Sequence, residues 1–266
     1  MCLFCGAPDD VVLFSEEDVV PKWLLHHLKL PSHDKSFHCV ADSKTGKITK
    51  HKVGSSFRFL EGRVCRLKCN NGWMSQLESQ VQPVLRSLLH APNRSLASVT
   101  RMERDVLSRW AIKTAYMLDL GGLEPRVPKE QIASLYDNAP YLPHNVYVFA
   151  RLQQRTRQWY YTEIAWWRHA ELTEVARLRV ERESYKVALQ FGDLILIVVY
   201  WPLAKWGIRV EKGKFAKLAP NTAVVKEYVH PSPGDTSTSE SACLLYATTI
   251  GVVPHRGAEG PVRPGA

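Results

Sequence analysis

The sequence predicts an α+β protein in which a small cysteine-rich unit precedes a larger unit of mixed helices and strands. Three observations support this class: two close-spaced cysteine pairs, apolar residues at helical spacing between 75 and 121, and a series of apolar, strand-like segments after 145. The 266 residues allow one large or two modest domains. We expect domains over 1–91 and 92–230, followed by a largely disordered tail over 231–266 that is rich in Ser, Thr, Gly and Pro.

The composition is that of a folded, soluble chain, with 45% hydrophobic and 23% charged residues. The formal net charge of +9 favours polyanionic partners, of which nucleic acid is the first to consider. No apolar run approaches the roughly 20 residues that cross a bilayer, and the N-terminus lacks the pattern of a secretory leader. We therefore expect a cytoplasmic protein with no membrane partner. In that reducing compartment the six cysteines are expected to be metal ligands or buried thiols rather than disulfides.

Helices are expected where apolar residues recur every three or four positions. One begins at Ser75, where Ser75-x-x-Glu78 can form a capping box, and another begins at Thr100 with Glu103 three residues on and ends at Gly121-Gly122. A short helix over 128–136 follows. Strands are expected over 145–152, 158–167, 185–191, 194–201 and 206–210. Tryptophans at these dense apolar positions favour core packing over base stacking; they are Trp73, Trp110, Trp159, Trp166 and Trp167.

Most of the excess positive charge lies in one short stretch. Between 44 and 68 there are eight bases and one acid, a local net charge of +7. Segments 48–53 and 57–60 alternate apolar residues with bases around Gly54-Ser55-Ser56, which predicts a basic hairpin. Such a ribbon either contacts nucleic-acid phosphates or only keeps the chain soluble. The candidate phosphate-binding residues are Lys50, Lys52, Arg58 and Arg66.

The cysteine spacing indicates a zinc site. Cys2-x-x-Cys5-Gly6 has the form of a knuckle in which a tight turn directs two thiolates at one ion, and Cys65-x-x-x-Cys69 supplies a second pair for tetrahedral coordination. The second spacing is one residue longer than usual, so Cys39 remains a competing fourth ligand. The alternative is a group of buried thiols.

Three stretches in a fixed order resemble the HNH endonuclease family over about the first ninety residues. They are Cys2-Leu-Phe-Cys5-Gly6, Ser15-Glu-Glu-Asp-Val-Val-Pro-Lys-Trp-Leu24, and Val64-Cys65 through Cys69-Asn-Asn-Gly-Trp-Met-Ser-Gln-Leu-Glu78. The later run Arg109-Trp-Ala-Ile-Lys-Thr-Ala115 is similar to the helix that often follows this domain in uncharacterised bacterial and phage members.

The resemblance implies a ββα-metal finger with a structural zinc on the knuckle cysteines and a separate catalytic ion. Glu17 and Asn70 would be ligands of that ion, and their oxygen atoms suit Mg²⁺ or Mn²⁺. The implied activity is metal-dependent hydrolysis of DNA phosphodiester bonds. As ordinary structural residues, Glu17 would instead be a carboxylate near a helix start and Asn70 a turn or cap residue.

The sequence departs from the family at the position of the general base, where Asp18 replaces the usual histidine. Aspartate is a much weaker base than histidine. Three alternatives remain: Asp18 is a further metal ligand and metal-bound hydroxide attacks; another histidine acts as the base; or the scaffold is catalytically silent and only binds nucleic acid or regulates. The candidate histidines are His26, His27, His38 and His51. Besides the nuclease and the silent scaffold, a further hypothesis is that residues 92–230 have a separate activity. That region has no Gly-rich phosphate loop, nucleophile elbow or paired catalytic carboxylates.

Overall fold

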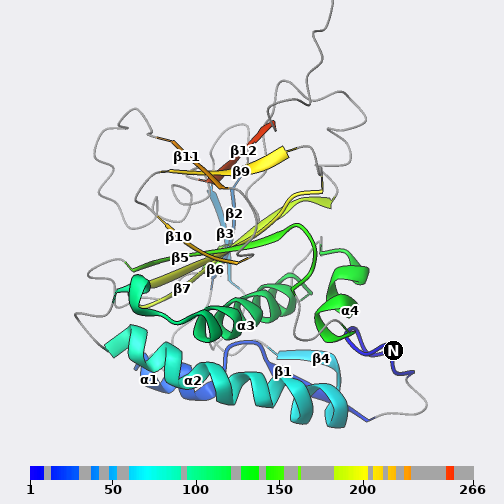
Figure 1. Cartoon of the computed structure of the whole chain (residues 1–266). Coiled ribbons are helices and arrows are strands. Elements are labelled where there is room, and N and C mark those ends of the chain that lie inside the picture. Colours follow the sequence, from blue (N-terminus) through cyan, green and yellow to red (C-terminus); the bar gives the residue numbers. More distant parts are fainter. Residues whose placement is uncertain are drawn as a thin grey trace, which may run out of the picture.

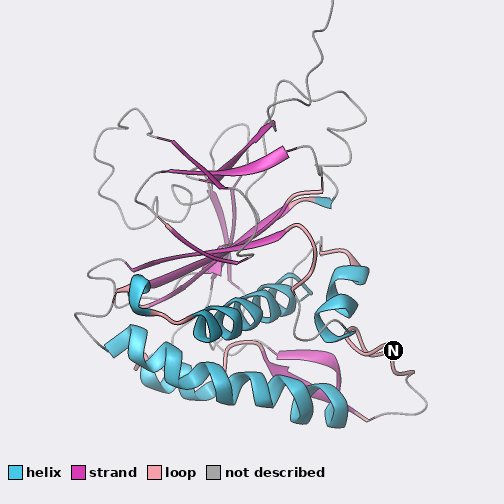
Figure 2. Cartoon of the chain, viewed as in Figure 1, coloured by secondary structure: helices cyan, strands magenta, loops and turns pink. Residues whose placement is uncertain are grey.

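A computed structural model shows helices and largely antiparallel sheets in an α+β arrangement (Figure 1). The structure describes residues 1–8, 13–29, 37–41, 48–52, 60–90, 95–120, 127–137, 142–152, 161–162, 183–202, 206–211, 215–219, 225–228 and 250–254 (Figure 2). Within that part of the chain, no helix combines the length and apolar character that crossing a bilayer requires.

The N-terminal part is a two-stranded ribbon followed by helices. Strand β1 (Phe14–Asp18) pairs antiparallel with β4 (Leu60–Cys65), and helix α1 (Lys22–His27) follows β1. The register places Phe14 opposite Cys65, with an irregularity between Ser15 and Glu17. After β4 the chain makes a loosely wound turn, η1 (Arg66–Met74), and enters α2 (Ser75–His90). The predicted helix start at Ser75 is confirmed.

The second strand of the predicted basic hairpin, 57–60, lies outside the described residues apart from Leu60. Strand β3 (Ile48–Lys52) pairs antiparallel with the preceding strand β2 (Phe37–Ala41), whereas Leu60 belongs to β4 and lies opposite Asp18. Turn-forming residues occur both before β3, in Asp-Ser-Lys-Thr-Gly-Lys over 42–47, and after it, over 54–56. Local turn composition therefore did not distinguish the two possible partners of β3.

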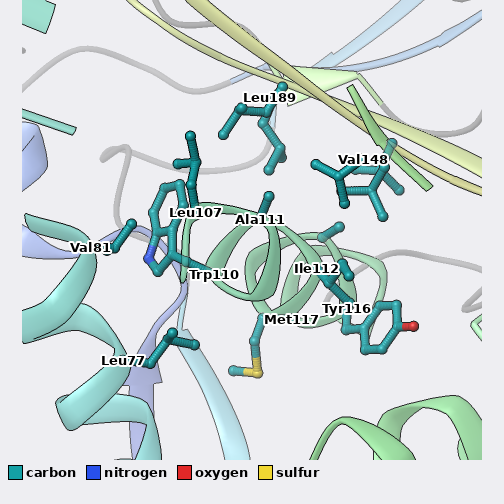
Figure 3. Close-up of a cluster of buried hydrophobic side chains, with 14 of the residues drawn as sticks. Leu77, Val81, Leu107, Trp110, Ala111, Ile112, Tyr116, Met117, Val148 and Leu189 are labelled. Carbon is teal, nitrogen blue, oxygen red and sulfur yellow. The ribbon is translucent and has the colours of Figure 1, made fainter. Parts of the chain in front are cut away.

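Helix α3 (Arg101–Leu120) lies between α2 and the main sheet (Figure 1). It follows a short 3₁₀ turn, η2 (Leu96–Ser98), and its predicted capping box is confirmed: the Thr100 N–H donates to Glu103 Oε2 at 2.8 Å and the Glu103 N–H donates to Thr100 Oγ1 at 3.3 Å. Figure 3 shows α3 side chains extending toward both layers, with labelled neighbours from α2, β5 and β7. Because α3 is covered on both sides, residues 107–119 are buried except for Arg109, which is half-buried.

The main sheet is antiparallel and has five strands in the order β10-β5-β8-β7-β6. They are β10 (Ala216–Ala219), β5 (Val146–Leu152), β8 (Leu194–Tyr200), β7 (Tyr185–Phe191) and β6 (Tyr161–Thr162). A further sheet has the order β11-β9-β12, formed by β11 (Val225–Tyr228), β9 (Trp206–Glu211) and β12 (Ile250–Pro254), with β11 parallel to β9. Helix α4 (Lys129–Asp137) precedes β5. The strands predicted over 145–152, 185–191, 194–201 and 206–210 and the helix over 128–136 are confirmed.

The buried core continues across the expected domain boundary near Pro92. One cluster of buried side chains includes Val64 and Leu85 before that point and Trp110 and Val198 after it. The division into two domains remains a prediction. In the predicted tail the structure describes β12, and the other residues of 231–266 lie outside the described part, as does the strand predicted over 158–167 apart from β6.

Candidate metal centre and its surroundings

The N-terminal knuckle is closed by two backbone hydrogen bonds. The Cys2 N–H donates to the Ala7 carbonyl at 2.7 Å, and the Gly6 N–H donates to the Cys2 carbonyl at 3.0 Å. Gly6 has a φ of +66°, a left-handed conformation that glycine adopts without the steric cost of a Cβ. The turn thus places Cys2 and Cys5 on the same side of a small loop.

Cys69 completes a cluster of three thiols. The sulfur atoms of Cys2, Cys5 and Cys69 all lie within 4.8 Å of one another, and the Cys2 and Cys69 sulfurs are 3.7 Å apart. Tetrahedral zinc with Zn–S bonds of about 2.3 Å requires sulfurs about 3.8 Å apart. Cys2 and Cys69 are buried and Cys5 is half-buried. This cluster could hold a metal ion.

Cys65, the fourth predicted ligand, adjoins the cluster through its main chain. Its backbone N–H donates to the Cys2 sulfur at 3.2 Å, but its own thiol is not part of the three-sulfur group. Backbone N–H donors to thiolates stabilise their negative charge. Cys39, the competing candidate, lies on β2 opposite Lys50, and its side chain is outside the described part of the structure.

The surroundings favour one thiolate within the cluster. The pKa of Cys2 is lowered chiefly by its hydrogen bond with the Cys69 thiol, against the effect of burial, and further by backbone groups of Cys5 and Cys65. The hydrogen bond with Cys2 raises the pKa of Cys69, and burial raises the pKa of Cys5. Three closely spaced thiols, one of them with a lowered pKa, match the soft donor set that zinc prefers.

Glu17, a predicted catalytic ligand, makes a buried ion pair. Lys113 Nζ of α3 donates to Glu17 Oε1 at 2.8 Å and to Glu78 Oε1 of α2 at 3.0 Å, and the Lys113 side chain has no exposed surface. Burial raises the pKa of Glu17, although Lys113 opposes the shift. Burial also opposes the charged form of Lys113, but Glu78 and Glu17 outweigh it and raise the Lys113 pKa. An ammonium group therefore neutralises the carboxylate that was expected to bind a divalent ion.

The other two predicted catalytic residues contact different groups. Asp18 lies 3.6 Å from the ammonium of Lys22, an exposed residue. Asn70 Nδ2 donates to Ser15 Oγ of β1 at 2.8 Å. The expected juxtaposition of β1 with the segment that opens α2 is thus present, but it is made through Ser15, and the Glu17 carboxylate is directed to α3.

Of the predicted phosphate-binding residues, Arg66 is exposed and stands at the start of η1, next to Lys68, which is also exposed. Lys50 and Lys52 belong to β3, and their side chains are outside the described part of the structure. Arg58 lies outside the described residues.

The sequence analysis missed the roles of Lys113 and Glu78. Glu78 was expected to cap α2, but its Oε1 accepts a hydrogen bond from Lys113 instead. A detectable signal was the lysine at the centre of an apolar helix, since Trp110 and Met117 lie three and four residues from it on the buried surface. The packing predicted for two tryptophans is confirmed: Trp110 is fully buried, and Trp73 packs between the Phe4 ring and the Arg109 guanidinium, at 5.6 Å from each.

Comparison of the chain with models of known families, with curated proteins and with solved structures finds no match.

Proposed function

We propose that the N-terminal part of this protein is a zinc-stabilised nucleic-acid-binding module built on an HNH-like, ββα-metal scaffold. The observation that carries the proposal is the position of η1: exposed Arg66 and Lys68 lie between buried Cys65 and Cys69, and the Cys69 sulfur belongs to the thiol cluster. Binding of an ion by Cys69 would therefore fix a cationic turn at the protein surface.

Zinc is the metal that suits this donor set best. Cys2, Cys5 and Cys69 supply three sulfurs, and Cys65 is the proposed fourth ligand because its main chain already lies 3.2 Å from the Cys2 sulfur. We expect about one zinc per chain. The variant Cys69→Ser should lose the metal, and Cys65→Ser should bind it more weakly. Cys243 lies outside both cysteine pairs, so Cys243→Ser should leave zinc binding unchanged.

Elemental analysis and the absorbance of the cadmium-substituted protein measure these changes, because the sulfur-to-cadmium band grows with the number of thiolates. Full zinc content in Cys69→Ser would contradict the site. An unchanged cadmium band in Cys65→Ser would assign the fourth position to another group.

Binding follows from the charge of this region. The stretch 44–68 carries a net charge of +7, and DNA phosphates that bind Lys or Arg release counterions, so affinity should fall steeply with salt. The double variant Arg66→Ala/Lys68→Ala should reduce the slope of log affinity against log salt by about 2. Arg101→Ala/Lys129→Ala, which removes two exposed cations from α3 and α4, is the matched control.

Binding without cleavage is the form of the proposal that the acidic residues support. The buried ammonium of Lys113 engages Glu17, so this carboxylate is not available as an uncompensated ligand for a divalent ion, and Asp18 lies beside the exposed ammonium of Lys22. In fluorescence anisotropy, we expect duplex DNA to bind with an affinity that depends on salt but not on added Mg²⁺ or Mn²⁺. Absence of binding at low salt would overturn the proposal.

A metal-dependent HNH-type nuclease acting on DNA is the second candidate. The observation that favours it is the hydrogen bond from Asn70 to Ser15, which holds the carboxamide of η1 against β1, the strand that carries Glu17 and Asp18. Plasmid nicking with Mg²⁺ or Mn²⁺ that disappears in Glu17→Ala/Asn70→Ala would support it over the silent form. Cleavage that appears only in the Asp18→His variant would show that the wild-type scaffold lacks only the general base for hydrolysis.

A further inference from the structure

Two leucines and two cations form an exposed surface at the end of the β1–β4 ribbon. Leu13 and Leu67 are 72% and 73% exposed, and Arg66 and Lys68, on either side of Leu67, are exposed as well. The Arg66 N–H donates to the Leu13 carbonyl at 2.9 Å, which places Leu13 at the same end of the ribbon. We call Leu13, Arg66, Leu67 and Lys68 the leucine tip.

Buried neighbours on either side hold the main chain of the leucine tip in place. Cys65 and Cys69 are buried on either side of it. Gly72 approaches so closely that a Cβ at this position would lie 2.9 Å from the Leu67 carbonyl oxygen. Within η1, the Leu67 backbone therefore packs closely against Gly72, while the Leu67 side chain is exposed to solvent. Because the main chain is already held, binding would restrict only the side chain of Leu67 when a partner covers it.

The charges of the leucine tip indicate what that partner is. Arg66 and Lys68 would attract anionic groups on both sides of Leu67, and an apolar site between those anions would bury the leucine side chain. Duplex DNA offers both, because phosphates line the minor groove and its base steps open to admit leucine wedges. Single strands are bound mainly through aromatic stacking platforms, which the leucine tip lacks.

On this basis we propose that the leucine tip binds the minor groove of duplex DNA, inserting Leu67 between base pairs while Arg66 and Lys68 contact the flanking phosphates. This inference rests on the proposed nucleic-acid-binding function and names its ligand. Partial unstacking at the inserted step would bend the duplex. Flexible pyrimidine–purine steps should therefore be preferred.

The test uses the full chain and a duplex with 2-aminopurine beside a central TA step, since this base brightens when it unstacks. Wild-type protein should raise its fluorescence. Leu67→Ala should abolish the rise and weaken binding about tenfold, as expected for loss of a buried leucine side chain. Met102→Ala, which removes a side chain that is 78% exposed on α3, is the matched control and should behave as wild type.

Leu67→Lys separates insertion from charge, because it keeps a cationic tip without the apolar wedge. It should bind duplex DNA with salt dependence and produce no fluorescence rise. Zinc content and Tm of each variant report on folding, and side chains this exposed should leave both unchanged. If wild-type protein binds no duplex DNA, the proposed function and this inference both fail. If it binds but Leu67→Ala matches it in affinity and fluorescence, or if it prefers the single strand, the inference alone is overturned.

Discussion

The Lys113 ammonium joins three elements that are distant in the sequence. It contacts Glu17 of β1, which lies 96 residues away, and Glu78 of α2. Buried charges are costly unless paired, so the arrangement constrains how α3 packs on the N-terminal ribbon. Asp18 and Lys22 form a more exposed pair on the same part of the chain, and such pairs contribute little to stability.

Lys113→Met should destabilise the protein by about 3 kcal/mol or more, because it leaves the buried carboxylate of Glu17 and the half-buried carboxylate of Glu78 without their counter-ion. Lys22→Met, which removes the exposed partner of Asp18, should cost less than about 1 kcal/mol. Urea unfolding at neutral pH measures both free energies. Adding Glu17→Gln and Glu78→Gln to Lys113→Met should recover part of the loss, and equal stability of the two single variants would contradict this account.

Lys186 is a second buried ammonium, on the other side of the main sheet. Its neighbour Tyr185 donates to Tyr116 of α3, so strand alternation directs Lys186 to the sheet face away from α3. Burial lowers the Lys186 pKa to about 7 from 10.5. Between these two values the unfolded chain binds more protons than the folded one, so this residue makes stability rise as pH increases.

We therefore expect the free energy of unfolding of Lys186→Met to exceed that of wild type most at neutral pH and to approach it toward pH 10. The difference between the two proteins isolates Lys186 from other groups that titrate in this range. Lys129→Met, at an exposed position in α4, should follow the wild-type pH profile. A constant difference between Lys186→Met and wild type would show that packing, and not protonation, is responsible.

At the scale of elements, η1 links the thiol cluster to the surface. Gly72 allows the chain to return close to the Leu67 carbonyl, with a Cβ contact of 2.9 Å if alanine stood there. Contacts this short with backbone atoms require the main chain to move. Cys69 lies between these two residues, so movement of the turn would displace its sulfur from those of Cys2 and Cys5.

Gly72→Ala should thus weaken zinc binding and DNA binding together, by about tenfold each if the turn shifts at a cost of about 1.4 kcal/mol. Gly6→Ala provides a comparison of another kind, because no atom lies within 4 Å of its Cβ position and only the left-handed φ of +66° opposes the substitution. Competition with a chromophoric chelator gives the zinc affinities. Wild-type zinc affinity in Gly72→Ala would show that η1 absorbs the extra methyl group.

The elements themselves were predictable because their signals are local. The capping box at Thr100 and the apolar runs of β7 and β8 fix helix and strand from neighbouring residues alone. Strand partners were not predictable in the same way, since turn-forming residues stand on both sides of β3, which pairs with β2. The thiol cluster followed from cysteine spacing, whereas the Lys113 contacts join residues that no local pattern relates.

At the scale of the whole molecule, the thiol cluster and the main sheet share one core. The buried cluster that contains Cys2 and Cys69 also contains Trp110 of α3 and strand residues such as Val198. Helix α3 packs on α2 from one side and on β10, β8 and β7 from the other (Figure 1). Loss of the ion should therefore be transmitted through α2 and α3 to the sheet.

Removal of zinc with a chelator should lower the Tm of the whole protein and leave one unfolding transition. Zinc bound at the proposed site would stabilise the folded state by an amount that grows with the logarithm of its free concentration over its Kd, so each tenfold excess would contribute about 1.4 kcal/mol. Calorimetry of the metal-loaded, chelator-treated and Cys69→Ser proteins measures this, with near-ultraviolet circular dichroism reporting the tryptophans of the shared core. If the regions on either side of Pro92 were independent domains, chelation would shift one of two transitions and leave the other in place. An upper transition that is insensitive to the chelator and retains the Trp110 signal would show that α3 and the main sheet fold independently of the thiol cluster.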